Sequence, residues 1–249
     1  MPWKKKRTVN ERLIIITATC LILTLAMLGY YLGQYRQEDV YNQEIVHIAF
    51  GGKTTKTGSS DTRGSKINHA ALKARNHDYI GWIEVDGTDI SHPIVQSKEE
   101  LFYLRRNFDK QHSIPGTIFM DYHNNKNFTD TNTMIFGHHM DDGSMFAPLK
   151  KFLKKDFFDK NKYIEIYTPE GDFRYEIFAV YETSVSNVPY KPGMMTEKEM
   201  TDFLAQVKKL ALHSRELNIS AQDKLLTLST CGYDFINGRI LVHAKLVAG

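Results

Sequence analysis

The chain has 249 residues, a formal net charge of +3, a hydrophobic content of 42% and two cysteines. Much of the basic excess lies in the first twelve residues, so the composition gives no support to nucleic-acid binding. Beyond an apolar N-terminal segment, roughly 200 residues remain, which favours one domain with a substantial core over several small ones.

The N-terminal segment predicts a membrane anchor. No charge occurs between Arg12 and Arg36, and residues 13–35 are long enough as a helix to cross a hydrocarbon layer of roughly 30 Å. Five basic residues precede the run (Lys4, Lys5, Lys6, Arg7 and Arg12). The positive-inside rule therefore predicts a cytoplasmic tail at 1–12 and an extracellular remainder. A cleaved signal peptide is the alternative, but its apolar core is normally shorter and is followed by a small-residue cleavage site.

The two cysteines lie in different parts of this plan. Cys20 is inside the predicted span, whereas Cys231 is alone in the exported part, so no intramolecular disulfide is expected there. In an oxidising compartment, an odd cysteine indicates either an intermolecular bridge or a thiol kept for chemistry.

Residues 36–66 are interpreted as a stalk and flexible linker, because 51–66 are rich in Gly, Ser, Thr and Lys and contain no large apolar residue. The folded domain is predicted at 67–249. Short helices are expected at 67–79, 98–108, 144–158 and 196–214, and in the third of these Met145, Phe146, Leu149, Phe152, Leu153 and Phe157 have core spacing. Strands are expected at 81–96 (two, around a turn at Asp86 and Gly87), 116–122, 132–138, 162–168, 173–183, 224–231 and 238–247.

The helix at 196–214 has the strongest local signals. Thr196 and Glu199 match a capping box, and an apolar stripe follows them (Met200, Phe203, Leu204, Val207, Leu210 and Ala211). Strands follow one another more often than they alternate with helices. The fold class is therefore mainly β with inserted helices, as a mixed sheet or barrel.

The last two strands carry the candidate chemistry. Cys231 ends the strand 224–231, and a short loop leads to Arg239 at the start of the next strand, where Ile240 and its alternate neighbours face the core. Neighbouring strands bring Arg239 beside Cys231. A guanidinium there favours a thiolate and offers donors to a developing oxyanion.

A thiol nucleophile also needs a proton carrier. Most of the ten histidines lie in polar helical, loop or turn contexts. His138 and His139 differ, because an apolar strand ending in Gly137 delivers them to its rim. His243 is on the face of Arg239, but roughly 13 Å further along the strand, out of reach.

These segments resemble the sortases, membrane-anchored cysteine transpeptidases of Gram-positive bacteria. The resemblance is carried by NTMIFGHHMDDGSMF (132–146) and by TLSTC (227–231) followed by Arg239. DYIGWIEVDGTDISHPIVQ (78–96), FYLRRNFD (102–109), GTIFMDY (116–122) and the helix at 196–214 look like class B sequence. Any one of these motifs is weak evidence, but together and in this order they are specific.

The resemblance implies an eight-stranded β-barrel of the sortase type after one transmembrane helix. It implies a catalytic trio of His138, Cys231 and Arg239, with His138 chosen over His139 because it directly follows the glycine. Cys231 would cleave a C-terminal sorting signal, similar to Asn-Pro-x-Thr, after Thr and form a thioacyl-enzyme. The partners implied are surface proteins bearing that signal and an amine of peptidoglycan or a pilin lysine.

Substrate contacts are expected from Ser229 and Thr230 beside the nucleophile, and from Tyr181 and Ser184 in or near the segment 183–190, which should form the groove wall. No cofactor is predicted. Asp141-Asp142-Gly143 is interpreted as a turn rather than a calcium loop, so no metal is predicted.

Two alternatives remain at this stage. An L,D-transpeptidase also orders His, Cys and Arg along its chain, but its motif has His-Gly before the cysteine, where this chain has Ser229-Thr230. The other alternative is a membrane-anchored binding module that keeps a sortase fold without turnover.

Overall fold

The computed structural model of the protein describes residues 9–51, 67–232 and 237–249. The predicted flexible linker falls largely on residues 52–66, outside the described residues. The chain divides into two compact units, Met1–His47 and Ile48–Gly249.

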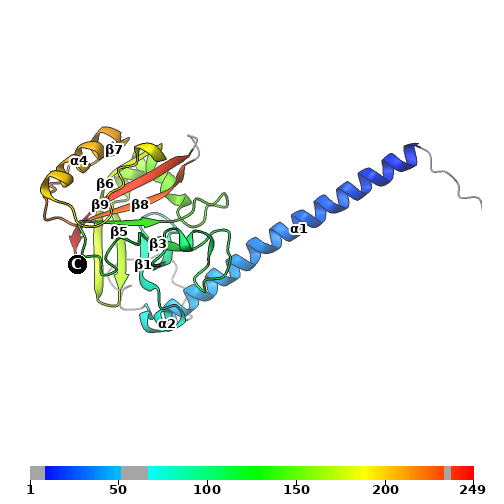
Figure 1. The fold of residues 1–249 in the computed structure, drawn as a ribbon, viewed down its shortest axis with the longest axis horizontal. Helices are drawn as coiled ribbons and strands as arrows, with labels where there is room; N and C mark the ends of the chain where they lie inside the picture. The colour runs from blue at the N-terminus through cyan, green and yellow to red at the C-terminus, as the bar shows by residue number, and fades with distance from the viewer. Residues whose placement is uncertain (1–8, 52–66, 233–236) are drawn as a thin grey trace, which may run out of the picture. The chain divides into compact units, whose positions relative to one another are not determined.

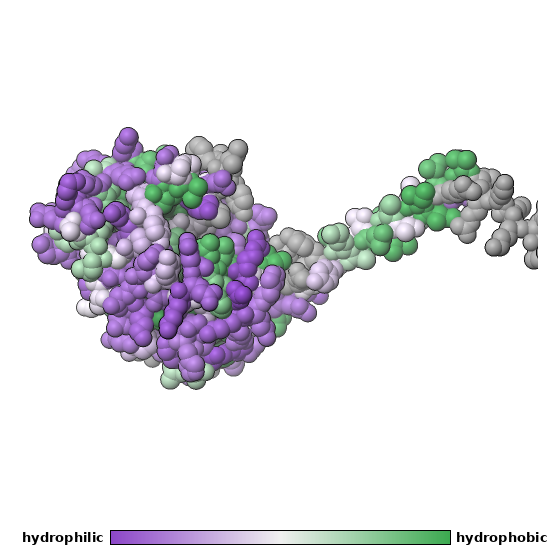
Figure 2. All heavy atoms as spheres, in the orientation of Figure 1, coloured by the Kyte–Doolittle hydropathy of each residue, from purple (hydrophilic) through white to green (hydrophobic). Residues whose placement is uncertain are grey.

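The first unit contains most of helix α1 (Val9–Phe50). Its segment Val9–Tyr30 is long and apolar enough to cross a membrane. Large apolar side chains are exposed along it, among them Leu13, Ile14, Leu21 and Met27. Figure 2 shows hydrophobic residues, in green, along this helix. A helix that is apolar on all sides needs an apolar environment, which a bilayer supplies.

The second unit is built mainly from strands (Figure 1). The strands are β1 (Tyr79–Val85), β2 (Ser91–Val95), β3 (Ile118–Met120), β4 (Asn132–Phe136), β5 (Tyr163–Thr168), β6 (Gly171–Ser184), β7 (His213–Ser214), β8 (Leu225–Gly232) and β9 (Gly238–Ala248). The helices are α2 (His69–Arg75), η3 (Phe102–Arg105), η4 (Ala147–Leu153), α3 (Lys155–Lys160), η5 (Val185–Asn187) and α4 (Glu197–Leu210).

The sheet closes into a barrel, as predicted. Its strand order is β5-β1-β2-β3-β4-β8-β9-β6-β7, and β5 also pairs with β6. Within the described residues, eight strands therefore form a closed ring, and the two-residue β7 is an added edge on β6. Closure satisfies the backbone groups that an open sheet would leave at its edges.

Helix α4 covers one side of this barrel. Its predicted capping box is present, and Met200, Phe203 and Val207 of its apolar stripe are buried. These residues pack on side chains of β6 and β9, including Tyr181 and Leu241. The expectation that β9 has one core face was therefore incomplete: on its other face, Leu241 and His243 are also buried, against residues of α4.

The segment 144–158 differs from the single helix expected. It consists of the 3₁₀ helix η4 and the short helix α3, separated by Lys154 in an extended conformation. The break changes which side chains reach the core, so Phe158 is fully buried and Phe157 is not. A helical periodicity continued through Lys154 predicts Phe157 as the core residue, whereas the structure buries Phe158.

A buried polar network crosses the barrel wall beneath α4. The Thr227 hydroxyl donates to Asn132 Oδ1 over 2.9 Å. Since this hydroxyl has only one proton, it accepts from His243 Nδ1 at 3.0 Å, and His243 Nε2 accepts from the Tyr181 hydroxyl at 2.9 Å. His243 is therefore neutral, and burial lowers its pKa to about 3.

This network predicts a loss of stability in acid. Unfolded His243 takes up a proton below pH 6.5, whereas the folded residue does so only near pH 3, so stability falls as the pH decreases between these values. Between pH 7 and pH 5, the His243 contribution to unfolding free energy should fall by about 2 kcal/mol. Urea unfolding at pH 7 and pH 5 would measure the change in unfolding free energy. In His243→Gln, that change should be smaller by the His243 contribution. The exposed His112 offers the control variant His112→Gln. An unchanged pH dependence in His243→Gln would contradict the assignment.

Candidate active site

The ends of three neighbouring strands meet at the predicted site. β4 runs parallel to β8 with Phe136 level with Ser229, and Gly137 N continues the ladder by donating to Ser229 O over 3.2 Å. His138 lies two residues beyond Phe136, just after β4 ends, and Cys231 lies two residues beyond Ser229 on β8. On the other side of β8, Cys231 is directly paired with Arg239 of β9. The predicted neighbourhood of Cys231 and Arg239 is therefore confirmed at the backbone.

The Cys231 backbone belongs to β8, but its side chain and residues 233–236 lie outside what the structure describes. The structure describes the neighbouring strands on both sides of β8, β4 and β9. The backbone pairing separates it from its β9 neighbour by one strand spacing, about 5 Å.

His138 is half-buried and held by its own backbone and ring. Its carbonyl accepts from Phe146 N over 2.8 Å, and its ring makes a hydrogen bond with the backbone of Leu104. Burial lowers the pKa of His138, the Leu104 bond opposes this, and the positive charge of Arg105 adds to the lowering. Nε2 is buried and has no hydrogen-bond partner among the described residues. That nitrogen is therefore available to exchange a proton at the site.

Gly137 is required by the close packing before His138. A Cβ there would lie 2.7 Å from two ring carbons of Phe146 and 3.1 Å from Ile118 Cδ1. The ring of Phe146 thus rests on the glycine, while the Phe146 amide holds the His138 carbonyl. One phenylalanine sets the direction in which the chain leaves β4.

Arg239 is half-buried on β9, between Cys231 of β8 and Thr183 of β6. Its Nη1 donates to the Gly238 carbonyl over 2.8 Å. This bond holds the guanidinium at the strand end and leaves most of its five donors for other acceptors.

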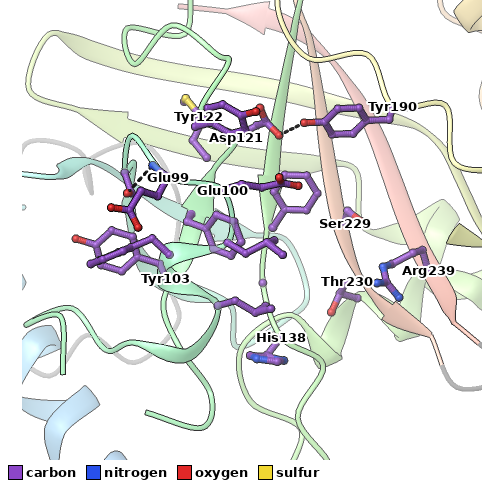
Figure 3. Close-up of a pocket in the computed structure, with 18 of the residues that line it drawn as sticks. Glu99, Glu100, Tyr103, Asp121, Tyr122, His138, Tyr190, Ser229, Thr230 and Arg239 are labelled. Atoms are coloured by element: carbon purple, nitrogen blue, oxygen red, sulfur yellow. Dashed lines mark hydrogen bonds between the residues drawn. The ribbon is translucent and has the colours of Figure 1, made fainter. Parts of the chain in front are cut away.

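A cavity of about 300 Å³ leads from these residues along the barrel wall (Figure 3). We call it the groove. Its lining is Ser97, Glu99–Leu104, Phe119–Tyr122, Phe136–His138, Val185, Tyr190, Ser229, Thr230 and Arg239. The lining surface is mostly apolar and includes charged and hydroxyl groups, a combination that suits a peptide ligand.

The predicted substrate-contact residues separate into two groups. Ser229 and Thr230 line the groove, and the 2% exposed Thr230 has a hydroxyl with no partner among the described residues. Tyr181 is buried under α4 and bonded to His243, and Ser184 bonds to Ser186, so neither belongs to the groove lining.

His139 forms a β-bridge with Met145 and is likewise not part of the lining. The sequence interpretation missed the wall formed by residues 99–104 and the contribution of Asp121. An apolar pattern in 98–108 indicated a helix, and in the structure the short η3 supplies that wall. The one available signal for Asp121 was its place as a charged residue directly after a buried strand. Because β3 is antiparallel to β4, Asp121 lies toward the sheet end away from His138.

Comparison with known proteins agrees with this geometry. A model of the Sortase domain matches residues 83–247. Sortase B of Listeria monocytogenes is 34% identical over 234 residues, covering 90% of this chain and 95% of that protein. The chain belongs to the sortase family. Sortase B of Staphylococcus aureus is 28% identical, covering 95% of this chain and 98% of that protein. The crystal structure of Clostridium perfringens sortase B has 38% identity and a TM-score of 0.69, covering 72% of this chain and 99% of that one.

The sortase is thus a class B member and a cysteine transpeptidase of the cell wall. The family acts on surface proteins that carry sorting signals and on wall amines. This assignment decides against the L,D-transpeptidase alternative.

The packing at Gly137 predicts that this sortase tolerates no side chain there. Gly137→Ala should lower the unfolding free energy by about 1–3 kcal/mol, because either Phe146 or the backbone of His138 has to move. It should also slow acylation by a substrate peptide, measured in a single turnover. Phe146→Leu in the same chain should restore part of both losses. Wild-type stability and rate in Gly137→Ala alone would show that the packing is looser than described.

Proposed function

We propose that Cys231 is the nucleophile, His138 the proton carrier and Arg239 the oxyanion donor of this transpeptidase. The Cys231 thiolate attacks the carbonyl carbon of the Thr in a sorting signal, and the negative charge on the carbonyl oxygen is stabilised by Arg239. The C–N bond then breaks, and His138 gives its proton to the leaving amine. An acceptor amine attacks the thioester and loses a proton to His138, and the C–S bond breaks to regenerate the thiolate.

The observation that supports this assignment is the backbone register of β4, β8 and β9. Cys231 is paired with Arg239 of β9, and His138 follows β4, the strand that runs parallel to β8 on its other side. The unpartnered Nε2 of His138 adds to it, because a proton carrier needs a ring nitrogen that no structural hydrogen bond occupies.

For the substrate, we propose a signal resembling Asn-Pro-x-Thr. The part before the scissile bond stays attached as the acyl group, so it needs a binding surface for the whole reaction, and the groove is the surface next to the site. The Thr230 hydroxyl offers this part of the peptide a hydrogen bond. The acceptor is a peptidoglycan amine or a pilin lysine.

We also propose the arrangement at the membrane: residues 1–12 in the cytoplasm, 13–35 across the bilayer, 36–66 as stalk and linker, and 67–249 as the extracellular catalytic domain. It is supported by the apolar helix segment Val9–Tyr30 and by the basic residues before it. An enzyme that anchors surface proteins has to work on the extracellular side, because its acceptor amines are outside the membrane.

A covalent adduct tests the function directly. Incubating the full chain in detergent micelles with an Asn-Pro-x-Thr peptide should add the mass of the acyl fragment, because the thioester forms before the acceptor attacks. Cys231→Ala keeps Cys20 and should give no adduct, which assigns the modified thiol by intact-mass spectrometry. A wild-type chain that binds the peptide and stays unmodified would instead indicate a binding module.

The role of Arg239 predicts a graded series. Arg239→Ala should lower the acylation rate constant by about 10²–10³, as for loss of a single oxyanion donor in other enzymes. Arg239→Lys should recover only part of this, because it keeps the charge and loses the planar set of donors. Single-turnover acylation of the three proteins would measure it. An alanine variant within about threefold of wild type would leave the oxyanion to other donors.

A further inference from the structure

One hydrogen bond joins two separate segments that line the groove. The Tyr190 hydroxyl donates to Asp121 Oδ2, drawn as a dashed line in Figure 3. Asp121 directly follows β3, whereas Tyr190 lies between η5 and α4, and both residues line the groove. In Figure 3 the pair lies at the opposite end of the view from His138.

Asp121 is the fixed partner in this contact. It is 4% exposed, and its amide donates to Met134 O over 2.9 Å while its carbonyl accepts from Gln96 Nε2 over 2.8 Å. Its Oδ1 accepts from both the amide and the Nδ1 of His123, each at 2.9 Å. Oδ2 is thus the carboxylate oxygen directed at Tyr190.

Tyr190 is the partner on the less supported segment. Its side chain remains 45% exposed. The segment is held to the barrel on either side of it, by Val185 N donating to Asn237 O over 3.0 Å and by Asn132 Nδ2 donating to Lys191 O over 2.8 Å. Burial and the bond to the Asp121 carboxylate raise the pKa of Tyr190, so its hydroxyl stays protonated and remains a donor.

From these contacts we infer that Asp121 is a positioning residue for the peptide substrate. It holds the Tyr190 ring as a fixed wall of the groove, against the part of the sorting signal that precedes the scissile Thr. This inference rests on the proposed function, because it is the acyl part of the peptide that has to remain in the groove. The contact acts on peptide binding, not on the chemistry at Cys231.

Tyr190→Phe removes only the hydroxyl and tests the inference with little risk to folding. In the full chain in micelles, it should raise KM for the peptide about five- to tenfold, the scale of one hydrogen bond to a charged group on a partly exposed site. The acylation rate constant at saturating peptide should stay within about twofold. Asp121→Asn should raise KM in the same direction, and the double variant should be less than additive.

Tyr122→Phe is the matched control. Tyr122 also lines the groove and is 40% exposed, and its hydroxyl has no hydrogen bond among the described contacts. The change in KM of Tyr122→Phe measures the effect of losing a groove hydroxyl that makes no hydrogen bond to Asp121. A Tyr190→Phe effect no larger than this control would overturn the inference, and so would equal losses in KM and in the acylation rate.

Hydrogen exchange of the segment 185–193 provides a readout that does not depend on activity. Tyr190→Phe and Asp121→Asn should speed exchange of its amides, and Tyr122→Phe should not. A wild-type chain that forms no adduct would contradict the proposed function, and the exchange data would still decide whether Asp121 holds the segment. Unchanged exchange in both Tyr190→Phe and Asp121→Asn would overturn the inference even if the enzyme is active.

Discussion

The parallel pairing of β4 with β8 is the constraint on which the site depends. Parallel strands end at the same edge of a sheet, whereas a hairpin would send the second strand back. The residues that follow β4 and those that end β8 therefore meet, although 95 residues separate Asn132 from Thr227. The chain between them forms a long crossover that contains β5, β6 and α4. A large part of the domain is thus the connection that allows this one pairing.

The register of that pair is held by polar contacts as well as by the ladder. Thr227 bonds to Asn132 at the start of the pair, and Phe146 holds Gly137 and His138 at its end. A shift by one residue would break the buried Thr227 bond and leave polar atoms unsatisfied, which costs roughly 1–3 kcal/mol for each. Such contacts make one register much more stable than its neighbours, and the position of the site follows from the register.

The electrostatic character of the groove changes along its length. Arg239 and the partly buried His138, with Arg105 close enough to lower its pKa, lie at the cysteine end. Glu99, Glu100 and Asp121 contribute carboxylates elsewhere in the lining. Positive charge near a cysteine favours its thiolate. In the proposed mechanism, the lowered pKa of His138 makes its imidazolium a stronger acid and so a better proton donor. The cost is that less His138 is protonated at neutral pH.

Much of this protein was already determined by its sequence. The apolar run, the capping box at Thr196 and the strand boundaries depend on neighbouring residues, and the motif around Gly137 and Cys231 identified the catalytic candidates. Tertiary structure alone decided that Leu241 and His243 of β9 are buried beneath α4, that the helix at 144–158 breaks at Lys154, and that Asp121 meets Tyr190. Such features depend on segments that are distant in the sequence. Asp121 and Tyr190, for example, are 69 residues apart. Periodicity along a chain records which face of an element is apolar, but not which distant element will cover it.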